Sequence, residues 1–259
     1  MGAHRGTFHY RRYFWRKGWL MYRVRRSWAD EASQIGAYDI LQNAIIAVKQ
    51  NPGYFIFDDV GNAVVFSMFY WAKLKKKIST YAKGQSVRVF RMGDGKWYLR
   101  NNAVVPKKAD MDLTKQVYDA DFKYTKEQAE HWVNSRGFDS PTNYLYWCNK
   151  YGQRVYIFQG SKGNWTQIKT YKCGTGNIKY GDGSDQGIGF KWKIWDKKKV
   201  FDGPQAKQYW NMHYTSLHGN SIHKGPYGHP STHGCIAMGE TAVKWVFNNI
   251  PLNTRVIVF

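Results

Sequence analysis

The chain has 259 residues, enough for one large domain or two smaller ones. Lys and Arg outnumber Asp and Glu by 39 to 18, so the formal net charge is +21, which predicts a polyanionic neighbour such as nucleic acid, anionic lipid or an anionic cell-wall polymer. No apolar run approaches the roughly 18–20 residues of a membrane-spanning helix, and no apolar signal-peptide core is visible, so we expect no transmembrane segment.

Residues 1–34 are predicted to form a basic, aromatic N-terminal arm without any acidic residue before Asp30. Its cations suit attachment to an anionic surface: Arg5, Arg11, Arg12, Arg16, Lys17, Arg23, Arg25 and Arg26. The interleaved aromatic residues would also suit single-stranded nucleic acid. Because no nucleic-acid-binding module follows, we expect no nucleic-acid partner.

Residues 35–105 are predicted to form a small α+β accessory module. The stretch "AYDILQNAIIAVKQ" has helical spacing and ends at the turn sequence "NPGY". Two alternating runs in "YFIFDDVGNAVVF" predict a hairpin, and "QSVRVFRMGDGKWYLRNNAVV" predicts further strands that turn at "GDG". Residues 106–141 are polar and predict a linker with a short helix, in which Thr125 and Gln128 have the spacing of a capping box.

From residue 142 the pattern changes to closely spaced strands. The stretch "NYLYWCNKYGQRVYIFQGSKGNWTQIKTYKCGTG" contains three alternating runs and predicts a β-meander. Two more strands are indicated by "GIGFKWKIWD" and "AKQYWNMHYTS", a helix by "ETAVKWVFNNI" and a closing strand by "TRVIVF". The fold class is therefore mostly β, with one main helix near the end of a domain at 142–259.

The three cysteines divide into a pair and a single residue. Cys148 and Cys173 fall on the first and third runs of the meander, where a disulfide or two core thiols would both fit. Cys235 lies instead in "STHGCIAM", directly after a glycine that permits a sharp backbone step. Main-chain amides at Gly234 and Cys235 would then face a developing oxyanion.

A catalytic thiol needs an imidazole to accept its proton. His233 is too close in sequence to reach Cys235 along an extended segment, so the base should come from a neighbouring strand. The candidates are His213, His218, His223 and His229. Zinc would find ligand atoms in His223, His229, His233 and Cys235, but no paired metal-ligand spacing is present, and we expect no metal and no cofactor.

The segment "STHGCIAM" resembles the [S/T]-H-G-C motif of the L,D-transpeptidase catalytic domain family (YkuD-like). The segments "VYIFQGSKGNWTQIKTYKCGTG" and "GIGFKWKI" are similar to two earlier strand segments of that family, and Pro251 and Thr254 match its usual ending. The resemblance covers residues 142–259. Two departures concern substrate contacts: Ala237 stands where the family often has Arg or Asn, and "SDQGIGF" replaces "T-P-T-G".

This resemblance implies a β-sandwich in which Cys235 is the nucleophile and an upstream histidine is its base. His218, 17 residues before Cys235, and His223, 12 residues before it, compete for that role. We predict His223, because "SIH" resumes a strand that points at the cysteine loop. Thr232 and His233 are expected to brace this loop, as they do in the family.

The resemblance further implies a peptidoglycan L,D-transpeptidase for cell-wall remodelling. The enzyme would form a thioester on tetrapeptide stems and make 3→3 cross-links. Its partners would be stem peptides and anionic wall polymers, and it would be a monomer located outside the cytoplasm at the wall. The alternative is a wall-binding or phage-associated protein with a hydrolytic or vestigial cysteine site.

Overall fold

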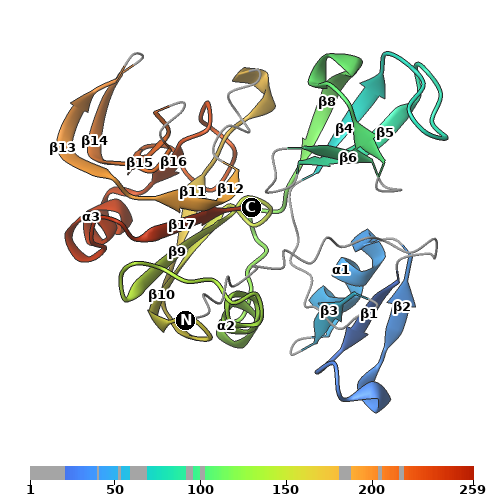
Figure 1. Cartoon of the computed structure of the whole chain (residues 1–259), viewed down its shortest axis with the longest axis horizontal. Helices are drawn as coiled ribbons and strands as arrows, with labels where there is room; N and C mark the ends of the chain where they lie inside the picture. The colour runs from blue at the N-terminus through green and yellow to red at the C-terminus, as the bar shows by residue number, and fades with distance from the viewer. Residues whose placement is uncertain are drawn as a thin grey trace, which may run out of the picture. The chain divides into compact units, whose positions relative to one another are not determined.

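The computed structural model describes residues 21–39, 41–51, 54–58, 69–91, 96–99, 103–180, 188–203, 206–215 and 219–259. The chain divides into two compact units, residues 1–64 and 65–259 (Figure 1). The first 20 residues of the predicted arm, the second run of the predicted hairpin and His218 all lie outside the described residues.

The first unit contains, within its described part, a three-stranded antiparallel sheet in the order β2-β1-β3 and one α-helix. The elements are β1 (Tyr22–Arg25), the 3-10 helix η1 (Glu31–Ser33), β2 (Gly36–Tyr38), α1 (Leu41–Gln50) and β3 (Phe55–Phe57). Residues 22–33 of the predicted arm are therefore folded. The charge of the buried Arg25 is satisfied, because its guanidinium donates to Gln34 Oε1 and to the Trp28 carbonyl.

The second unit begins with an antiparallel sheet whose described strands have the order β7-β6-β5-β4-β8. They are β4 (Phe69–Leu74), β5 (Ser86–Arg91), β6 (Trp97–Leu99), β7 (Val104–Val105) and β8 (Met111–Val117). Strand β8 follows the 3-10 helix η2 (Lys108–Asp110). Residues 111–117 were expected to be linker, and this is wrong. Met111 is buried while most of the polar side chains of β8 are at least partly exposed, so a half-buried strand carries a linker-like composition.

The helix predicted around Thr125 is confirmed as α2 (Lys126–Ser135). Thr125 Oγ1 accepts from the Gln128 N–H at 3.2 Å, and Gln128 Oε1 accepts from the Thr125 N–H at 2.9 Å, which completes the capping box. On the buried face of this helix, the Trp132 ring stacks on Trp147 with centroids 4.2 Å apart. The helix is thereby packed into the second unit.

The largest sheet has nine described strands in the order β12-β17-β9-β10-β11-β16-β15-β14-β13. These are β9 (Tyr144–Asn149), β10 (Arg154–Ser161), β11 (Asn164–Gly174), β12 (Gly189–Lys193), β13 (Asp196–Asp202), β14 (Lys207–His213), β15 (Ser221–Lys224), β16 (Ile236–Met238) and β17 (Arg255–Val258). The predicted meander is confirmed as β9-β10-β11. Strand β11 pairs with β10 along its length and with β16 at its end, so it joins the two halves of a curled sheet (Figure 1).

The predicted main helix is α3 (Glu240–Asn249), and its Val243 and Val246 enter the same core as Tyr146, Met212 and Ile222. The mostly β fold is thus confirmed. Strand β13 was not predicted, because "DKKKVFD" has the composition of a loop. It forms the edge of the sheet, where lysines discourage pairing with another chain. Lys197 of this strand also donates to the carbonyls of Phe247 and Ile250 at the end of α3.

Candidate active site

Two short parallel strands bring the predicted thiol and base together. In the pair β15–β16, Ile222 lies opposite Ile236 and His223 opposite Ala237, so Cys235, directly before β16, reaches the end of β15. The apolar Ile222 and Ile236 side chains are fully buried in the core and fix this register. The side chain of His223 points to the other face of β15, because neighbours along a strand alternate.

The thiol of Cys235 and the imidazole of His223 shift each other's ionisation. Burial opposes ionisation of the thiol, but hydrogen bonding to His223, the charge of His223 and hydrogen bonds from Ser221 outweigh it, so the pKa of Cys235 lies below its ordinary value. Burial likewise lowers the pKa of His223, but the interactions with Cys235 outweigh it and raise the pKa above its ordinary value. The pair therefore favours thiolate and imidazolium.

The carbonyl of Lys224 orients the imidazole. His223 Nδ1 lies 2.8 Å from this oxygen, which fixes Nδ1 as the protonated nitrogen and leaves Nε2 for the thiol. The Lys224 side chain lies on the opposite face of the strand from His223 and forms an ion pair with Glu240 at 2.6 Å. One strand residue thus anchors both the base and the first turn of α3.

Thr232 makes two hydrogen bonds within the loop before Cys235. Thr232 Oγ1 donates to the Cys235 carbonyl at 2.7 Å and accepts from the Gly234 N–H at 3.2 Å. The φ angle of Gly234 is 145°, a conformation that side chains rarely adopt, and the Tyr214 hydroxyl donates to its carbonyl at 3.1 Å. The Gly234 amide was expected to face an oxyanion, but in this structure it braces the loop.

His233 packs against a neighbouring segment of the chain. Its ring stacks on Tyr180, with centroids 4.2 Å apart. The segment before Tyr180 holds the loop as well: the Asn177 N–H donates to the Thr232 carbonyl at 2.8 Å, and the Asn177 side chain donates to the Pro230 carbonyl at 2.9 Å. The loop geometry is therefore fixed from a segment more than 50 residues away in sequence.

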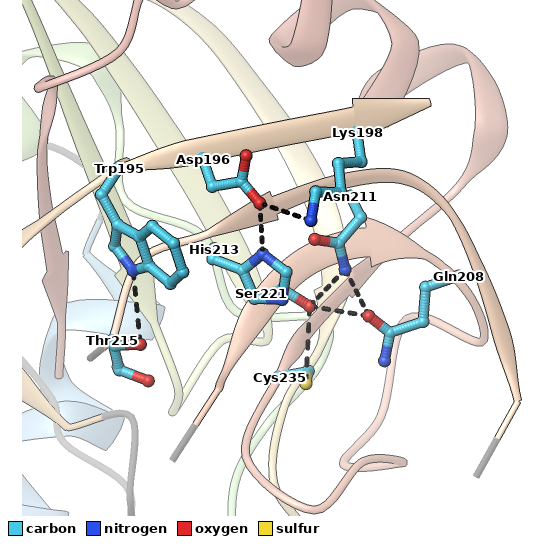
Figure 2. A network of polar contacts seen from close by, with 9 residues as sticks. All are labelled: Trp195, Asp196, Lys198, Gln208, Asn211, His213, Thr215, Ser221 and Cys235. Atoms are coloured by element: carbon cyan, nitrogen blue, oxygen red, sulfur yellow. Dashed lines mark hydrogen bonds and ion pairs between the residues drawn. The ribbon is translucent and has the colours of Figure 1, made fainter. Parts of the chain in front are cut away.

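Beside Cys235 lies a polar cluster that the sequence did not point to (Figure 2). The Ser221 hydroxyl is 3.8 Å from Cys235 Sγ, and it also contacts Gln208 Oε1 at 2.9 Å and Asn211 Nδ2 at 2.8 Å. Ser221 could have been found from the sequence, because it is two residues before His223 and so shares its face of the strand. Gln208 and Asn211 belong to β14 and had no such signal.

A second histidine lies on the same sheet but has a different partner. His213 Nδ1 is 3.3 Å from Asp196 Oδ2, and its ring stacks on Trp195 (Figure 2). Burial lowers the pKa of His213, and although Asp196 raises it, the charges of Lys198 and His223 add to the lowering. His213 is therefore an imidazole oriented by a carboxylate, with its neutral form favoured, and the hydrogen bond to the thiol comes from His223.

The other predicted site residues have separate positions. His229 is exposed, and no group of three or more His, Cys, Asp or Glu side chains that could hold a metal ion occurs among the described residues. Cys148 and Cys173 are both free, fully buried thiols whose sulfur atoms lie 3.8 Å apart. Ala237 is fully buried. None of the helices that the structure describes is long and apolar enough to cross a membrane.

Comparison with known families gives a match over most of the chain. The model of the YkuD family, described as the L,D-transpeptidase catalytic domain, matches residues 67–258. This range starts well before residue 142 and includes the described sheet of β4 to β8. None of the curated proteins matches the chain.

Solved structures that this chain is similar to include a fused Zn-dependent amidase/peptidase/peptidoglycan-binding domain-containing protein from Clostridium acetobutylicum. It is 22% identical, with a TM-score of 0.41 and coverage of 52% of this chain and 59% of that chain. An L,D-transpeptidase from Mycobacterium smegmatis is 14% identical, with a TM-score of 0.37 and coverage of 45% and 58%. One from Stackebrandtia nassauensis is 14% identical, with a TM-score of 0.39 and coverage of 52% and 67%. The chain thus spans less than two thirds of the length of the first two.

Proposed function

The chain belongs to the YkuD family of L,D-transpeptidase catalytic domains, and from this premise we propose that it is a peptidoglycan L,D-transpeptidase with Cys235 as its nucleophile. The observation that carries the proposal is the pairing of Cys235 with His223, in which the pKa of the thiol is lowered and that of the imidazole is raised. A thiolate held beside an imidazolium at a partly exposed site is the arrangement that acyl transfer requires.

In the first step, Cys235 Sγ attacks the carbonyl carbon between the third residue of a tetrapeptide stem and its terminal D-Ala. A carbon–sulfur bond forms, the carbon–nitrogen bond breaks, and the departing D-Ala amine takes the proton held by His223. The Cys235 main-chain N–H is the donor that we assign to the oxyanion, since the Gly234 N–H already donates to Thr232 Oγ1.

In the second step, the side-chain amine of a neighbouring stem attacks the thioester carbonyl. His223 accepts the proton of that amine, and the sulfur leaves as the thiolate, which restores the starting pair. The product is a 3→3 cross-link. Hydrolysis replaces the amine by water, and the same residues serve both outcomes.

The substrate places the proposed site of action at the cell wall, outside the cytoplasm. The positive charge fits this proposal, because teichoic acids and other wall anions would hold a +21 protein near its substrate. Attraction of this kind is local, since physiological salt screens charges beyond roughly 8 Å.

The test is to incubate the purified protein with disaccharide-tetrapeptide muropeptides and identify the products by mass spectrometry. We expect release of D-Ala and formation of 3→3 dimers. Cys235→Ala and His223→Ala should each lose this activity by a factor of about 100 or more, while His229→Ala, at an exposed residue, should retain it.

A protein with a vestigial site would give neither D-Ala nor dimers, and its Cys235 would form no covalent adduct with a carbapenem. An active His223→Ala variant beside an inactive His218→Ala variant would instead move the role of the base to His218. Release of D-Ala without dimers would indicate a hydrolytic enzyme.

A further inference from the structure

We propose that Ser221 is a positioning residue whose hydroxyl proton moves from Gln208 to the sulfur of Cys235 when the thiol ionises. The inference rests on the proposed function only in treating Cys235 as the nucleophile. It assigns a role to a polar cluster on β14 and β15 that neither the motif nor the family match identifies (Figure 2).

The geometry places one hydroxyl between two acceptors. Ser221 is fully buried, and its Oγ lies 3.8 Å from Cys235 Sγ and 2.9 Å from Gln208 Oε1. Asn211, also fully buried, donates from Nδ2 to the same Oγ at 2.8 Å and donates to Gln208 Oε1 as well. The side chains of Ser221, Gln208 and Asn211 therefore form a closed triangle, and the Cys235 sulfur lies beside its Ser221 corner.

Hydrogen-bond capacity decides how this triangle works. A serine hydroxyl has one proton, and Asn211 already occupies a lone pair of Oγ, so the proton can point to Gln208 or to the sulfur but not to both. A neutral thiol is a weak acceptor, and the amide oxygen of Gln208 holds the proton while Cys235 is protonated. A thiolate is a charged acceptor, and charge-assisted hydrogen bonds are about twice as strong as neutral ones.

The same exchange would follow the reaction. Formation of the thioester removes the charge from sulfur, so the hydroxyl returns to Gln208, and release of the thiolate attracts it again. No bond other than a hydrogen bond is made or broken at Ser221. Its contribution is to favour the ionised nucleophile before attack and the ionised leaving group during deacylation.

Other titratable or polar groups around Cys235 and its loop belong to the neighbouring elements and are not removed by a substitution at Ser221. His223 is the charged partner on β15, and Tyr214, which follows β14, holds the Gly234 carbonyl through its hydroxyl. His213 lies farther along β14 with Asp196 and Lys198 beside it. Burial keeps Tyr214 neutral by raising its pKa well above the ordinary value. A change in the pH dependence of Cys235 reactivity on replacing Ser221 can therefore be attributed to the lost hydroxyl and not to these groups.

The experiment measures the rate of alkylation of Cys235 by iodoacetamide against pH, with intact-mass detection and Cys235→Ala as the blank for the two buried thiols. Ser221→Ala should raise the midpoint of the profile by about one pH unit, and Ser221→Thr, which keeps the hydroxyl, should restore most of that shift. Gln208→Leu, at a partly exposed residue, should lower the midpoint, because the Ser221 hydroxyl has then lost its competing acceptor and can donate to the sulfur.

Opposite shifts in the two variants would support the proposal. Equal midpoints in Ser221→Ala and the unchanged protein would overturn it, and so would an upward shift in Gln208→Leu. Should Ser221→Ala fail to fold, the Gln208→Leu profile decides alone. Because alkylation needs no stem peptide, absence of D-Ala release with the expected shifts would reject the proposed function and keep this inference, whereas active enzyme with unshifted profiles would do the reverse.

Discussion

At the scale of the residue, the proposed chemistry depends on a thiol and an imidazole that each shift the other's pKa toward the charged form. Burial alone would raise the pKa of the thiol and lower the pKa of the imidazole, and the hydrogen bond and charge that each group supplies to the other reverse both shifts. The thiolate is lost as the pH falls through the pKa of Cys235, and the imidazolium is lost as the pH rises through the pKa of His223. Activity that needs both should therefore pass through a maximum between these limits.

Replacing the imidazole should return Cys235 to the behaviour of an ordinary, partly buried thiol. We expect His223→Gln to move the alkylation midpoint upward by at least about one pH unit, toward or beyond 8.5. The alkylation rate at pH 6 should fall about tenfold. His229→Gln is the matched control, since that histidine is exposed, and its profile should follow the unchanged protein. Coincident profiles for the two variants would remove His223 from the role of base.

At the scale of the element, the loop that carries Cys235 is shaped by hydrogen bonds and not by packing alone. Thr232 contacts both sides of Gly234, whose φ is positive, through the Gly234 amide and the Cys235 carbonyl. Its hydroxyl therefore sets where the Cys235 amide points. It does not touch the sulfur, so its effect should appear in acylation and not in ionisation.

This distinction can be measured with Thr232→Val and Thr232→Ser. Loss of two hydrogen bonds near the reacting carbonyl should slow acylation of Cys235 by a carbapenem about tenfold or more in the valine variant. The serine variant should react at nearly the normal rate, and both should keep the normal alkylation midpoint. A valine variant with normal acylation would show that the loop is held without this hydroxyl.

One strained residue on β14 directs side chains to the two faces of the sheet. Trp210 has φ of 57°, which is uncommon for a bulky residue, and it packs on Phe247 of α3 with ring centroids 5.4 Å apart. On either side of it, Gln208 and Asn211 both contact Ser221, on the face of the cysteine. Regular alternation would place Gln208 and Asn211 on opposite faces, so the polar cluster depends on this conformation.

At the scale of the whole molecule, the charge predicts how the protein meets its surroundings. Lys and Arg exceed Asp and Glu by 21 over the full chain, so binding to purified walls that carry anionic polymers should weaken about tenfold or more between 0.05 and 0.5 M salt. Co-sedimentation at a series of salt concentrations measures this. Walls stripped of teichoic acid are the control, and equal binding to both would argue against anionic polymers as partners.

Much of the second unit could be predicted from the sequence, because many of its strands alternate clearly, α2 begins with a capping box and α3 has helical spacing of its apolar residues. The meander of β9 to β11, the capping box of α2 and the helix α3 were all predicted and are confirmed. The edge strand β13 and strand β8 were missed for one reason: strands with few buried positions can carry charges like those of a loop.

By itself the sequence determined the mostly β fold and pointed to Cys235 and the loop residues around it as a candidate site, because periodicity and a local motif lie in consecutive residues. Only the tertiary structure decided which polar groups surround that sulfur. Gln208, Asn211 and Ser221 come from two strands, and their meeting depends on the pairing of β14 with β15 and on the backbone of Trp210. Side chains that strand pairing brings together have no characteristic separation in the sequence from which their contact could be predicted.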